Sequence, residues 1–378
     1  MMSDIKTIGI VGGGQLGRML TGAAKKLGYT VIVLDPTESS PAGQVADEQI
    51  LGDFKDGEAI KSLAQFSDIL TFEIEHVHEK ALLELQEGGK IVHPSPQTLQ
   101  IIKDKFRQKE FLQKVGIPTA PFYAVENKAD IQKIAEKIGY PFLLKARTEA
   151  YDGKGNVVVK HKGAIDKAIE KLKGRPLYIE EFVPFEKELA VVVARSTTGE
   201  IVSYPVVETI HVENVCDTVI VPARASVKSQ DNAEELAVRT MELLKGAGVF
   251  GIEMFLVNDD NVLVNEIAPR VHNSGHYSIE ASITSQFEQH IRAITGLPLG
   301  ATDLLSKAVV MKNILGERHG SGFPEGLDEA LKISGVSIHM YGKAESRPGR
   351  KMGHITVTGE SVEECLKKAE AARKAIVI

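Results

Sequence analysis

The chain has 378 residues, of which 43% are hydrophobic and 25% charged, a composition typical of a globular protein with two or three domains. Its net charge of −6 and isoelectric point near 6.0 provide no basic surface for nucleic acid or an anionic membrane. No apolar run approaches the ~20 residues that span a bilayer, and the first residues have no signal-peptide pattern. Cys216 and Cys365 have no metal-ligand spacing and predict reduced thiols, which are typical of a cytoplasmic protein. Together with the charge and the lack of long apolar runs, this predicts a cytoplasmic protein without nucleic-acid or membrane partners.

The first hundred residues alternate short apolar strands with helical segments. Apolar residues at helical spacing follow the first strand, from Leu16 to Leu27. Strands and helices in alternation predict a parallel sheet with right-handed crossovers. The expected strands are residues 7–11, 30–35, 68–74 and 89–95.

The pattern changes near residue 102. Residues 101–115 predict one charged amphipathic helix, which Gly116 and Pro118 end. A small α+β unit follows and contains a Gly-rich loop between two strands. Long antiparallel strands come next, including a hairpin within residues 249–276, and short β and turn segments begin at about residue 308.

The first strand runs into the sequence GGGQLG, a glycine spacing typical of dinucleotide-binding turns. Asp35 ends the second strand, 18 residues after Gly17, where such folds hold an adenosine ribose. Gln15 and Arg18, however, suit a small phosphorylated ligand at the helix N-terminus equally well. This segment alone leaves both ligands open.

Two acidic residues lie inside the apolar strands of the expected hairpin. If Asp259 and Asp260 form its tip, residues i and 519−i pair, which places Glu253 opposite Glu266. Like charges that face each other destabilise a sheet, unless a cation lies between them. Two carboxylates with Asn265 beside one of them are typical oxygen ligands of Mg²⁺. We therefore expect a metal site at Glu253 and Glu266.

A Gly-rich loop, YDGKGN, lies between two of the expected strands. Its backbone N–H groups and Lys154 suit a polyphosphate, although the loop has no Walker pattern. Lys145, at the end of the preceding strand, and Lys105, on the charged helix, add two cations. Residues 180–183 are placed to offer backbone groups to a purine, and Glu188 follows at a distance suited to ribose hydroxyls.

These features, in this order, resemble the ATP-grasp superfamily: a lysine, a strand lysine, a Gly-rich loop, a hinge strand and two acidic residues on paired strands. Five segments closely resemble the 5-(carboxyamino)imidazole ribonucleotide synthase family of purine biosynthesis: GGGQLGRML, TFEIEHV, YDGKGN, RPGRKMGHI and the long run that begins NEIAPRVHNSGH. The resemblance covers essentially the whole chain. In this superfamily the first domain is Rossmann-like without holding a dinucleotide, which favours the phosphorylated ligand.

The resemblance implies an α/β and α+β protein with the ATP-grasp fold. It implies an N-terminal Rossmann-like domain at residues 1–103 and an ATP-grasp domain at residues 104–307. The latter would contain a small lid domain at about residues 118–186 and a central antiparallel sheet. A small β-rich C-terminal domain would take residues 308–378.

The family reaction joins ATP, bicarbonate and aminoimidazole ribonucleotide into a carbamate, with release of ADP and phosphate. Bicarbonate is a poor electrophile, so its oxygen first attacks the γ-phosphorus to give carboxyphosphate. That step depends on positioning and on charge neutralisation. The resemblance thus implies an ATP-grasp carbon–nitrogen ligase that uses ATP and Mg²⁺.

The resemblance also assigns roles to residues of this chain. The expected catalytic residues are Arg270, His272, Asn273, Tyr151, Asp152 and Lys154. The expected ATP site is Lys105, Lys145, Ala150, Tyr151, Asp152, Gly153, Lys154, Gly155, Asn156, Glu180, Glu181, Phe182, Val183, Glu188, His211, Asn265 and Glu266. The expected site for the imidazole ribonucleotide is Gly14, Gln15, Leu16, Glu73, Glu75, Lys343, Arg350 and Lys351. The expected metal ligands are Glu253 and Glu266.

Three other functions compete with this one. A formate-dependent glycinamide ribonucleotide transformylase is a closely similar ATP-grasp enzyme. An NAD-dependent dehydrogenase would account for the glycine turn and for nothing after residue 105. A non-catalytic nucleotide-binding regulator would lack the metal ligands, and both glutamates are present. The family resemblance also implies a homodimer.

Overall fold

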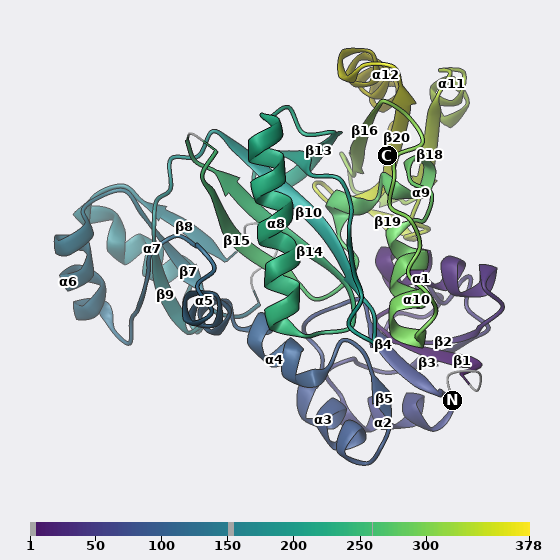
Figure 1. Ribbon diagram of the computed structural model, residues 1–378, viewed down its shortest axis with the longest axis horizontal. Coiled ribbons are helices and arrows are strands. Elements are labelled where there is room, and N and C mark those ends of the chain that lie inside the picture. The colour runs from purple at the N-terminus through teal and green to yellow at the C-terminus, as the bar shows by residue number, and fades with distance from the viewer. Residues whose placement is uncertain (1–4, 150–154, 259) are drawn as a thin grey trace.

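The computed structural model describes residues 5–149, 155–258 and 260–378, and Figure 1 shows their arrangement. A unit with a parallel sheet carries the N-terminus, and a small lobe with its own sheet protrudes on the opposite side of a long central sheet (Figure 1). Among these residues, no helix combines the length and the apolar character needed to cross a membrane.

The elements of the N-terminal unit are β1 (Thr7–Val11), α1 (Gln15–Lys26), β2 (Thr30–Asp35), β3 (Glu48–Leu51), α2 (Gly57–Gln65), β4 (Ile69–Phe72), α3 (Glu79–Glu87), β5 (Ile91–Val92) and α4 (Pro96–Lys103). The strand order is β3-β2-β1-β4-β5, and every neighbouring pair is parallel, as the sequence predicts. The pattern does not predict β3, whose side chains are only partly buried. One face of the sheet packs against α1 and the later α10 (Gln286–Thr295), and the other against α2, α3 and α4.

The charged segment after this sheet forms two helices and not the single helix that its pattern predicts. α4 ends and α5 (Lys105–Lys114) begins at Asp104. The Asp104 carboxylate accepts hydrogen bonds from the Phe106 and Arg107 N–H groups at 3.0 and 3.2 Å, which caps α5 and ends the preceding helix. The first residue of α5 donates its own N–H to the Arg147 carbonyl at 2.7 Å. The break therefore fixes where α5 meets the small lobe.

The small lobe is built on a four-stranded antiparallel sheet in the order β6-β9-β7-β8. Its elements are β6 (Phe122–Ala124), α6 (Lys128–Ile138), β7 (Phe142–Ala146), β8 (Asn156–Val159), η1 (Lys162–Ala164), α7 (Ile165–Lys171) and β9 (Leu177–Glu181). Asn127 and Asp130 form a capping box that begins α6. Both helices pack on the sheet around Phe142 and Leu144, so the lobe has a hydrophobic core of its own.

The central sheet carries the expected hairpin. Its elements are β10 (Lys187–Arg195), β11 (Ile201–Ser203), β12 (Val207–Val212), β13 (Val215–Val221), α8 (Val227–Leu244), β14 (Gly248–Leu256), β15 (Val262–Ala268), η2 (Asn273–Gly275) and α9 (Ser278–Ala281). All its strand pairs are antiparallel, as predicted. The long helix α8 covers one face of β10, β14 and β15 (Figure 1), and α10 packs on the other face.

Most of the strands after residue 307 continue the central sheet, whereas the two shortest, Gly320–Ser321 and Glu345–Ser346, pair with each other in a separate sheet. The elements are β16 (Ala308–Leu315), β17 (Gly320–Ser321), α11 (Leu327–Leu331), β18 (Val336–Met340), β19 (Glu345–Ser346), β20 (Lys351–Gly359) and α12 (Val362–Ala375). β16 pairs with β13, and the order β15-β14-β10-β12-β13-β16-β20-β18, with β11 beside β10, makes nine strands. One hydrogen-bonded sheet therefore links the hairpin to the C-terminal segment.

Candidate active site

The hairpin of β14 and β15 brings two carboxylates together. Glu253 pairs directly with Glu266, as the sequence predicts. Nearer the turn, however, Met254 pairs with Val264 and not with Asn265, and a β-bulge then restores the expected register. Asn265 is the extra residue of this bulge, and its buried Oδ1 has no hydrogen-bond partner among the described residues. Three oxygen-bearing side chains are thereby concentrated at one point of the hairpin.

Each of the two carboxylates has a basic side chain as its partner. Lys105 Nζ lies 3.0 Å from Glu266 Oε2, and His272 Nε2 lies 3.2 Å from Glu253 Oε1. Burial alone would raise the pKa of Glu253, but the hydrogen bond and charge of His272, together with His211 and Lys105, outweigh burial and lower the pKa to about 2. Burial also opposes the charge of Lys105, yet its acidic neighbours raise the pKa of this lysine. Glu253 is therefore ionised and Lys105 charged at neutral pH.

Two more ion pairs lie beside these two. We call the four pairs the row of charges: Lys105–Glu266, His272–Glu253, Arg270–Glu75 and His211–Glu188. Arg270 Nη2 lies 3.1 Å from Glu75 Oε1, which connects the N-terminal unit to the chain just after β15. His211 Nδ1 contacts the carboxylate of Glu188 between β12 and β10. Burial would lower the pKa of His211, but the hydrogen bond and charge of Glu188 raise it. Opposite charges from the N-terminal unit and the central sheet thus alternate through one continuous site.

A buried group of three charges lies where the small lobe meets α5. Glu180 on β9 lies 3.4 Å from Lys145 Nζ on β7 and 3.3 Å from Lys109 Nζ on α5, and all three side chains are almost completely buried. Burial lowers the pKa of Lys109 to about 8, against the opposite effect of Glu180. Burial would raise the pKa of Glu180, but the two lysines lower it. Two lysines face one glutamate, so this junction favours an additional anion.

The glycine turn binds groups of its own chain. Asp35 accepts a hydrogen bond from the Gly13 N–H at 2.8 Å. Glu73 accepts the N–H groups of Gly14 and Gly17 at the start of α1, the second at 2.7 Å. Burial raises the pKa of Glu73, although both N–H groups act in the opposite direction. The groups expected to hold a dinucleotide, or a ligand phosphate at the helix N-terminus, are therefore already occupied.

The C-terminal segment reaches the N-terminal unit near this turn. Gln44 Nε2 donates to the Gly342 carbonyl at 2.8 Å, directly after β18. Lys343 Nζ donates to the Lys351 carbonyl at 2.6 Å, and Arg350 Nη1 donates to a neighbouring carbonyl at 2.7 Å. Three predicted cations are thus gathered on a segment that contacts the N-terminal unit.

The hairpin fits a hard divalent cation. Its donors are the two carboxylates and the unpartnered oxygen of Asn265, which are the ligand types that Mg²⁺ prefers. A second cluster, Glu280, His339 and His354, also has ligand atoms within 4.8 Å of one another. Its two imidazole rings are stacked with centroids 4.6 Å apart and planes at 13°, so their lone pairs lie in two nearly parallel planes, which disfavours convergence on one ion. Within the described part of the chain, the hairpin is the better metal site.

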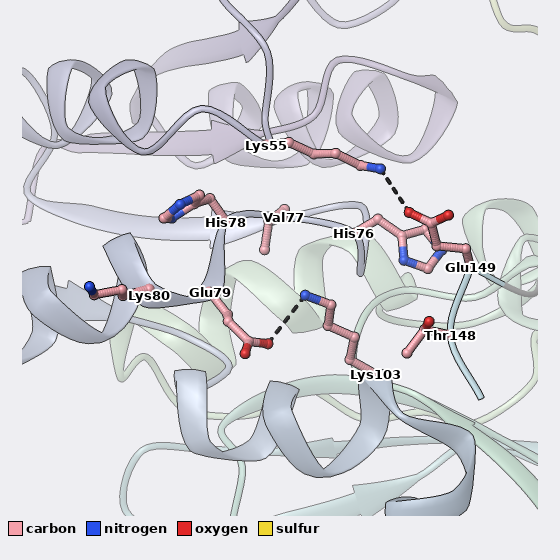
Figure 2. Close-up of a pocket in the computed structure, with 9 residues that line it drawn as sticks. All are labelled: Lys55, His76, Val77, His78, Glu79, Lys80, Lys103, Thr148 and Glu149. Atoms are coloured by element: carbon pink, nitrogen blue, oxygen red, sulfur yellow. Dashed lines mark hydrogen bonds and ion pairs between the residues drawn. The ribbon is translucent and has the colours of Figure 1, made fainter. Parts of the chain in front are cut away.

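A pocket of about 480 Å³ opens beside the row of charges. Figure 2 shows the two ion pairs among its lining residues, Lys55 with Glu149 at 2.9 Å and Lys103 with Glu79 at 3.2 Å. His76 also lines the pocket, and it directly follows Glu75, whose carboxylate pairs with Arg270. The pocket therefore borders the site on the side from which the expected phosphate loop starts.

Comparison with known families matches three stretches of the chain. Residues 5–103 match the ribonucleotide synthetase preATP-grasp domain, residues 110–287 the ATP-grasp domain, and residues 309–368 the phosphoribosylaminoimidazole carboxylase C-terminal domain. Over 98% of its length the chain is 41% identical to the N5-carboxyaminoimidazole ribonucleotide synthase of Synechococcus elongatus, of which 94% is covered. The chain belongs to this synthase family.

Solved structures of the synthase family share the fold. The Thermotoga maritima synthetase has a TM-score of 0.90 and 52% identity, with 99% of each chain covered. The Aspergillus clavatus synthase, solved with ADP and 5-aminoimidazole ribonucleotide, has a TM-score of 0.91 and 40% identity, also with 99% of each chain covered. The chain spans 65% to 68% of the length of the fungal proteins named phosphoribosylaminoimidazole carboxylase that it matches. The predicted ATP-grasp fold with an N-terminal and a C-terminal domain is confirmed.

In this member of the synthase family, many predicted site residues lie together. The row of charges, the hairpin and the buried group contain Glu75, Lys105, Lys145, Glu180, Glu188, His211, Glu253, Asn265, Glu266, Arg270 and His272. Asn273 begins η2, directly after His272. Gly155 and Asn156 are the last two residues of the expected phosphate loop, and Asn156 pairs with Lys145 across β7 and β8. Outside the described residues lie the predicted Ala150, Tyr151, Asp152, Gly153 and Lys154.

The structure adds detail to three of the predicted contacts. The Leu16 side chain is packed in the core of the N-terminal unit, so only its backbone is left for a ligand. Glu181 accepts a hydrogen bond from the Tyr123 hydroxyl at 2.6 Å, so its side chain is engaged away from Glu180. β9 ends at Glu181, and Phe182 and Val183 belong to the chain after the strand. The hinge therefore offers backbone groups at its end and only one buried carboxylate.

Lys109, Gln108 and Gln286 are not among the residues that the sequence predicts for the site. A charged helix suggests that Lys109 is exposed, yet its spacing of four from Lys105 places both on one helix face and was an available signal. The two glutamines bond to the backbone of β15 and of the segment after it. No sequence pattern identifies such bonds, because they depend on elements far apart in the chain.

Proposed function

We propose that this member of the synthase family uses ATP and bicarbonate to carboxylate 5-aminoimidazole ribonucleotide, giving 5-(carboxyamino)imidazole ribonucleotide, ADP and phosphate in purine biosynthesis. The observation that carries the proposal is the hairpin, where Glu253 faces Glu266 and the bulge adds Asn265. Family membership and the ATP-grasp fold support the same reaction.

In this proposal, the nucleotide lies between the small lobe and the central sheet. Backbone groups at the end of β9 take the adenine, Glu188 takes the ribose, and Lys105 and Lys145 take the phosphates, together with the expected loop. Bound Mg²⁺ would neutralise phosphate charge, and its ligands would be Glu253 and Glu266. Each glutamate already has a partner that stabilises its negative charge, the Lys105 ammonium for one and the His272 imidazole for the other.

Bicarbonate activation is assigned to the chain after β15. The guanidinium of Arg270 is a fork for two oxygens of bicarbonate and then of carboxyphosphate, and Glu75 holds it in place at 3.1 Å. His272 and Asn273 complete this anion site. The bicarbonate oxygen attacks the γ-phosphorus, and ADP leaves. The amine nitrogen then bonds to the carboxyl carbon, the phosphate leaves with the electron pair of the broken C–O bond, and the amine loses a proton.

The imidazole ribonucleotide is assigned to the region between the glycine turn and the C-terminal segment. Glu73 is fixed by two N–H groups of the turn and keeps lone pairs for the ribose hydroxyls. Because Glu73 occupies the start of α1, the ligand phosphate goes to Lys343, Arg350 and Lys351 instead. Gln15 and the backbone at Gly14 and Leu16 line the same region, and the predicted Tyr151 and Asp152 orient the amine.

The decisive experiment measures ADP release by the purified protein. We expect release to require Mg²⁺ and, for coupled product formation, both bicarbonate and 5-aminoimidazole ribonucleotide. Formate with glycinamide ribonucleotide tests the transformylase alternative in the same assay. Turnover with that pair and none with bicarbonate would overturn the proposed function.

Two further properties belong to this proposal. We expect a homodimer, as the family resemblance implies, and analytical ultracentrifugation should give twice the mass of the chain. We also expect a cytoplasmic location, which two free, buried cysteines support.

A further inference from the structure

The chain after β15 is held by a buried glutamine. Gln286, the first residue of α10, is completely buried. Its Oε1 accepts the N–H of His272 at 2.9 Å, and its Nε2 donates to the carbonyl of the same residue at 2.7 Å. The Gln286 N–H donates to the Ser278 hydroxyl at 2.9 Å, which fixes the start of the helix. One side-chain amide thus does for His272 what a neighbouring strand does for a residue within a sheet.

This clamp determines where the His272 ring lies. Ser274 Oγ lies 2.8 Å from its Nδ1, and Glu253 Oε1 lies 3.2 Å from its Nε2. The ring also packs on Gly251, where an added Cβ would come within 2.4 Å of the His272 Cβ. With Ser274 donating to Nδ1, the proton resides on Nε2 and is directed at the glutamate of the hairpin.

Two buried glutamines hold the two ends of the same segment. Gln108 on α5 accepts the Ile267 N–H at 2.9 Å and donates to the Ile267 carbonyl at 3.1 Å. Arg270 lies between the two held residues. The stretch that carries the guanidinium fork and the imidazole, directly after the proposed metal ligand Glu266, is therefore anchored from α5 and from α10.

We propose that Gln286 is a positioning residue for bicarbonate activation: it acts through His272, holding the imidazole against Glu253 beside the anion site. This inference rests on the proposed function and adds a residue to it. Loss of the clamp lets the backbone at His272 shift, which displaces the imidazole and the adjoining anion site. Small displacements of this kind cost far more in turnover than in ATP binding, because ATP is held by other elements.

The same helix offers a matched control. Gln289 is also completely buried, and it makes the same pair of bonds to Gly300, accepting its N–H at 2.8 Å and donating to its carbonyl at 2.7 Å. Gly300 lies outside the row of charges and the hairpin. Replacing either glutamine by methionine removes both of these bonds to the backbone and keeps a side chain of similar length, and at Gln286 it also removes the contact of Nε2 with His276 Nδ1 at 3.1 Å.

The first experiment compares Gln286→Met with Gln289→Met. Both variants should lose a similar amount of thermal stability. Gln286→Met should lower kcat, and kcat/KM for bicarbonate, by about 10- to 100-fold, with the Kd of ATP within about twofold of wild type. Gln289→Met should leave both kinetic constants within about twofold. Equal kinetic losses in the two variants would overturn the proposal, because the effect would then be structural only.

The second experiment uses Gln286→Glu and is independent of the first. A protonated carboxyl reproduces the amide, accepting the His272 N–H and donating to its carbonyl, whereas the carboxylate only accepts. Burial raises the pKa of a carboxylic acid, so the new group should titrate in the working range of the enzyme. His276, the nearest titratable side chain of the clamp at 3.1 Å, stays neutral because burial lowers its pKa well below the ordinary value.

We expect the kcat of Gln286→Glu relative to wild type to rise at least about tenfold as the pH falls from about 8 to about 6. Gln289→Glu should show no such pH dependence in kcat. A flat ratio for Gln286→Glu would overturn the positioning role. Wild type lacking bicarbonate-dependent turnover would instead refute the proposed function, so the two failures are distinguishable.

Discussion

Replacing Glu266 by glutamine should destabilise the ligand-free protein as well as stop turnover. From the sequence alone, the change would relieve the repulsion between two facing glutamates. In the structure Glu266 pairs with Lys105 at 3.0 Å, and the lysine side chain is only 10% exposed. Glu253, the facing carboxylate, already has His272 as a partner. The attraction lost is therefore larger than the repulsion removed.

The expected magnitude follows from these contacts. Removing one partner of a buried ion pair costs about 3–5 kcal/mol. The Glu266 side chain is 35% exposed, and Glu75 still attracts Lys105, so the cost reduces to about 1–2 kcal/mol. At roughly 2 °C per kcal/mol for a large chain, the melting temperature should fall by about 2–4 °C.

Scanning calorimetry of the ligand-free variant at low and high salt measures this change. Lys105→Gln and the double variant complete a cycle that isolates the pair. Turnover of Glu266→Gln should fall about 100-fold or more if Glu266 is the metal ligand that we propose. An increase in the melting temperature of Glu266→Gln would refute the reasoning, since repulsion by Glu253 would then dominate. Near-normal turnover would remove Glu266 from the metal site.

Three other predictions concern different parts of the site. Arg350→Ala should raise the KM for the imidazole ribonucleotide about tenfold or more without changing the KM for ATP, whereas Arg270→Ala should depress kcat at saturating substrates. Steady-state kinetics with each substrate varied in turn measures both effects. A higher KM for ATP in Arg350→Ala, with that for the imidazole ribonucleotide unchanged, would contradict the assignment. The pKa of Glu253 is about 2 in the folded protein, against an ordinary value of 4.5. This difference stabilises the folded state by about 3 kcal/mol above pH ~5, and the stabilisation is lost as the pH falls to ~2. Glu253→Gln should remove that part of the acid sensitivity, and an unchanged stability–pH curve from chemical unfolding would refute it. Calorimetry should find binding of ATP with Mg²⁺ and none of NAD, because Asp35 and Glu73 already occupy the glycine turn; tight NAD binding would count against that assignment.

The sequence was informative where chemistry and spacing act locally. Alternating apolar strands predict the parallel sheet, and two glutamates inside apolar strands predict the carboxylate pair. The bulge at Asn265 was not predicted, although it leaves a trace in the sequence: Val262, Val264 and Ile267 pack in one core, so the period of two breaks at the bulge. Asp104 looks like one more charge on an amphipathic helix, and only its bonds to the Phe106 and Arg107 N–H groups make it a boundary.

Partners from distant elements were beyond the reach of the pattern. Glu73 ends a strand whose position suggests a ligand contact, and the structure shows that its oxygens also hold the glycine turn. Lys109 has the composition of a solvent-exposed residue and lies in a buried group of charges. Each of these two side chains bonds to an element more than fifty residues away along the chain, so the spacing of residues within one segment cannot predict its partner.

The continuity of the central sheet has a consequence for shortened forms of the protein. β16 supplies the hydrogen-bond partners of β13 from Thr218 to Val221. A chain that stopped at residue 307 would leave this apolar strand as an open edge, with unpaired backbone groups available to another molecule. Such a fragment would retain the whole carboxylate hairpin and would still tend to aggregate by edge-to-edge pairing. The C-terminal strands thus act as a solubility cap for the domain that carries the hairpin.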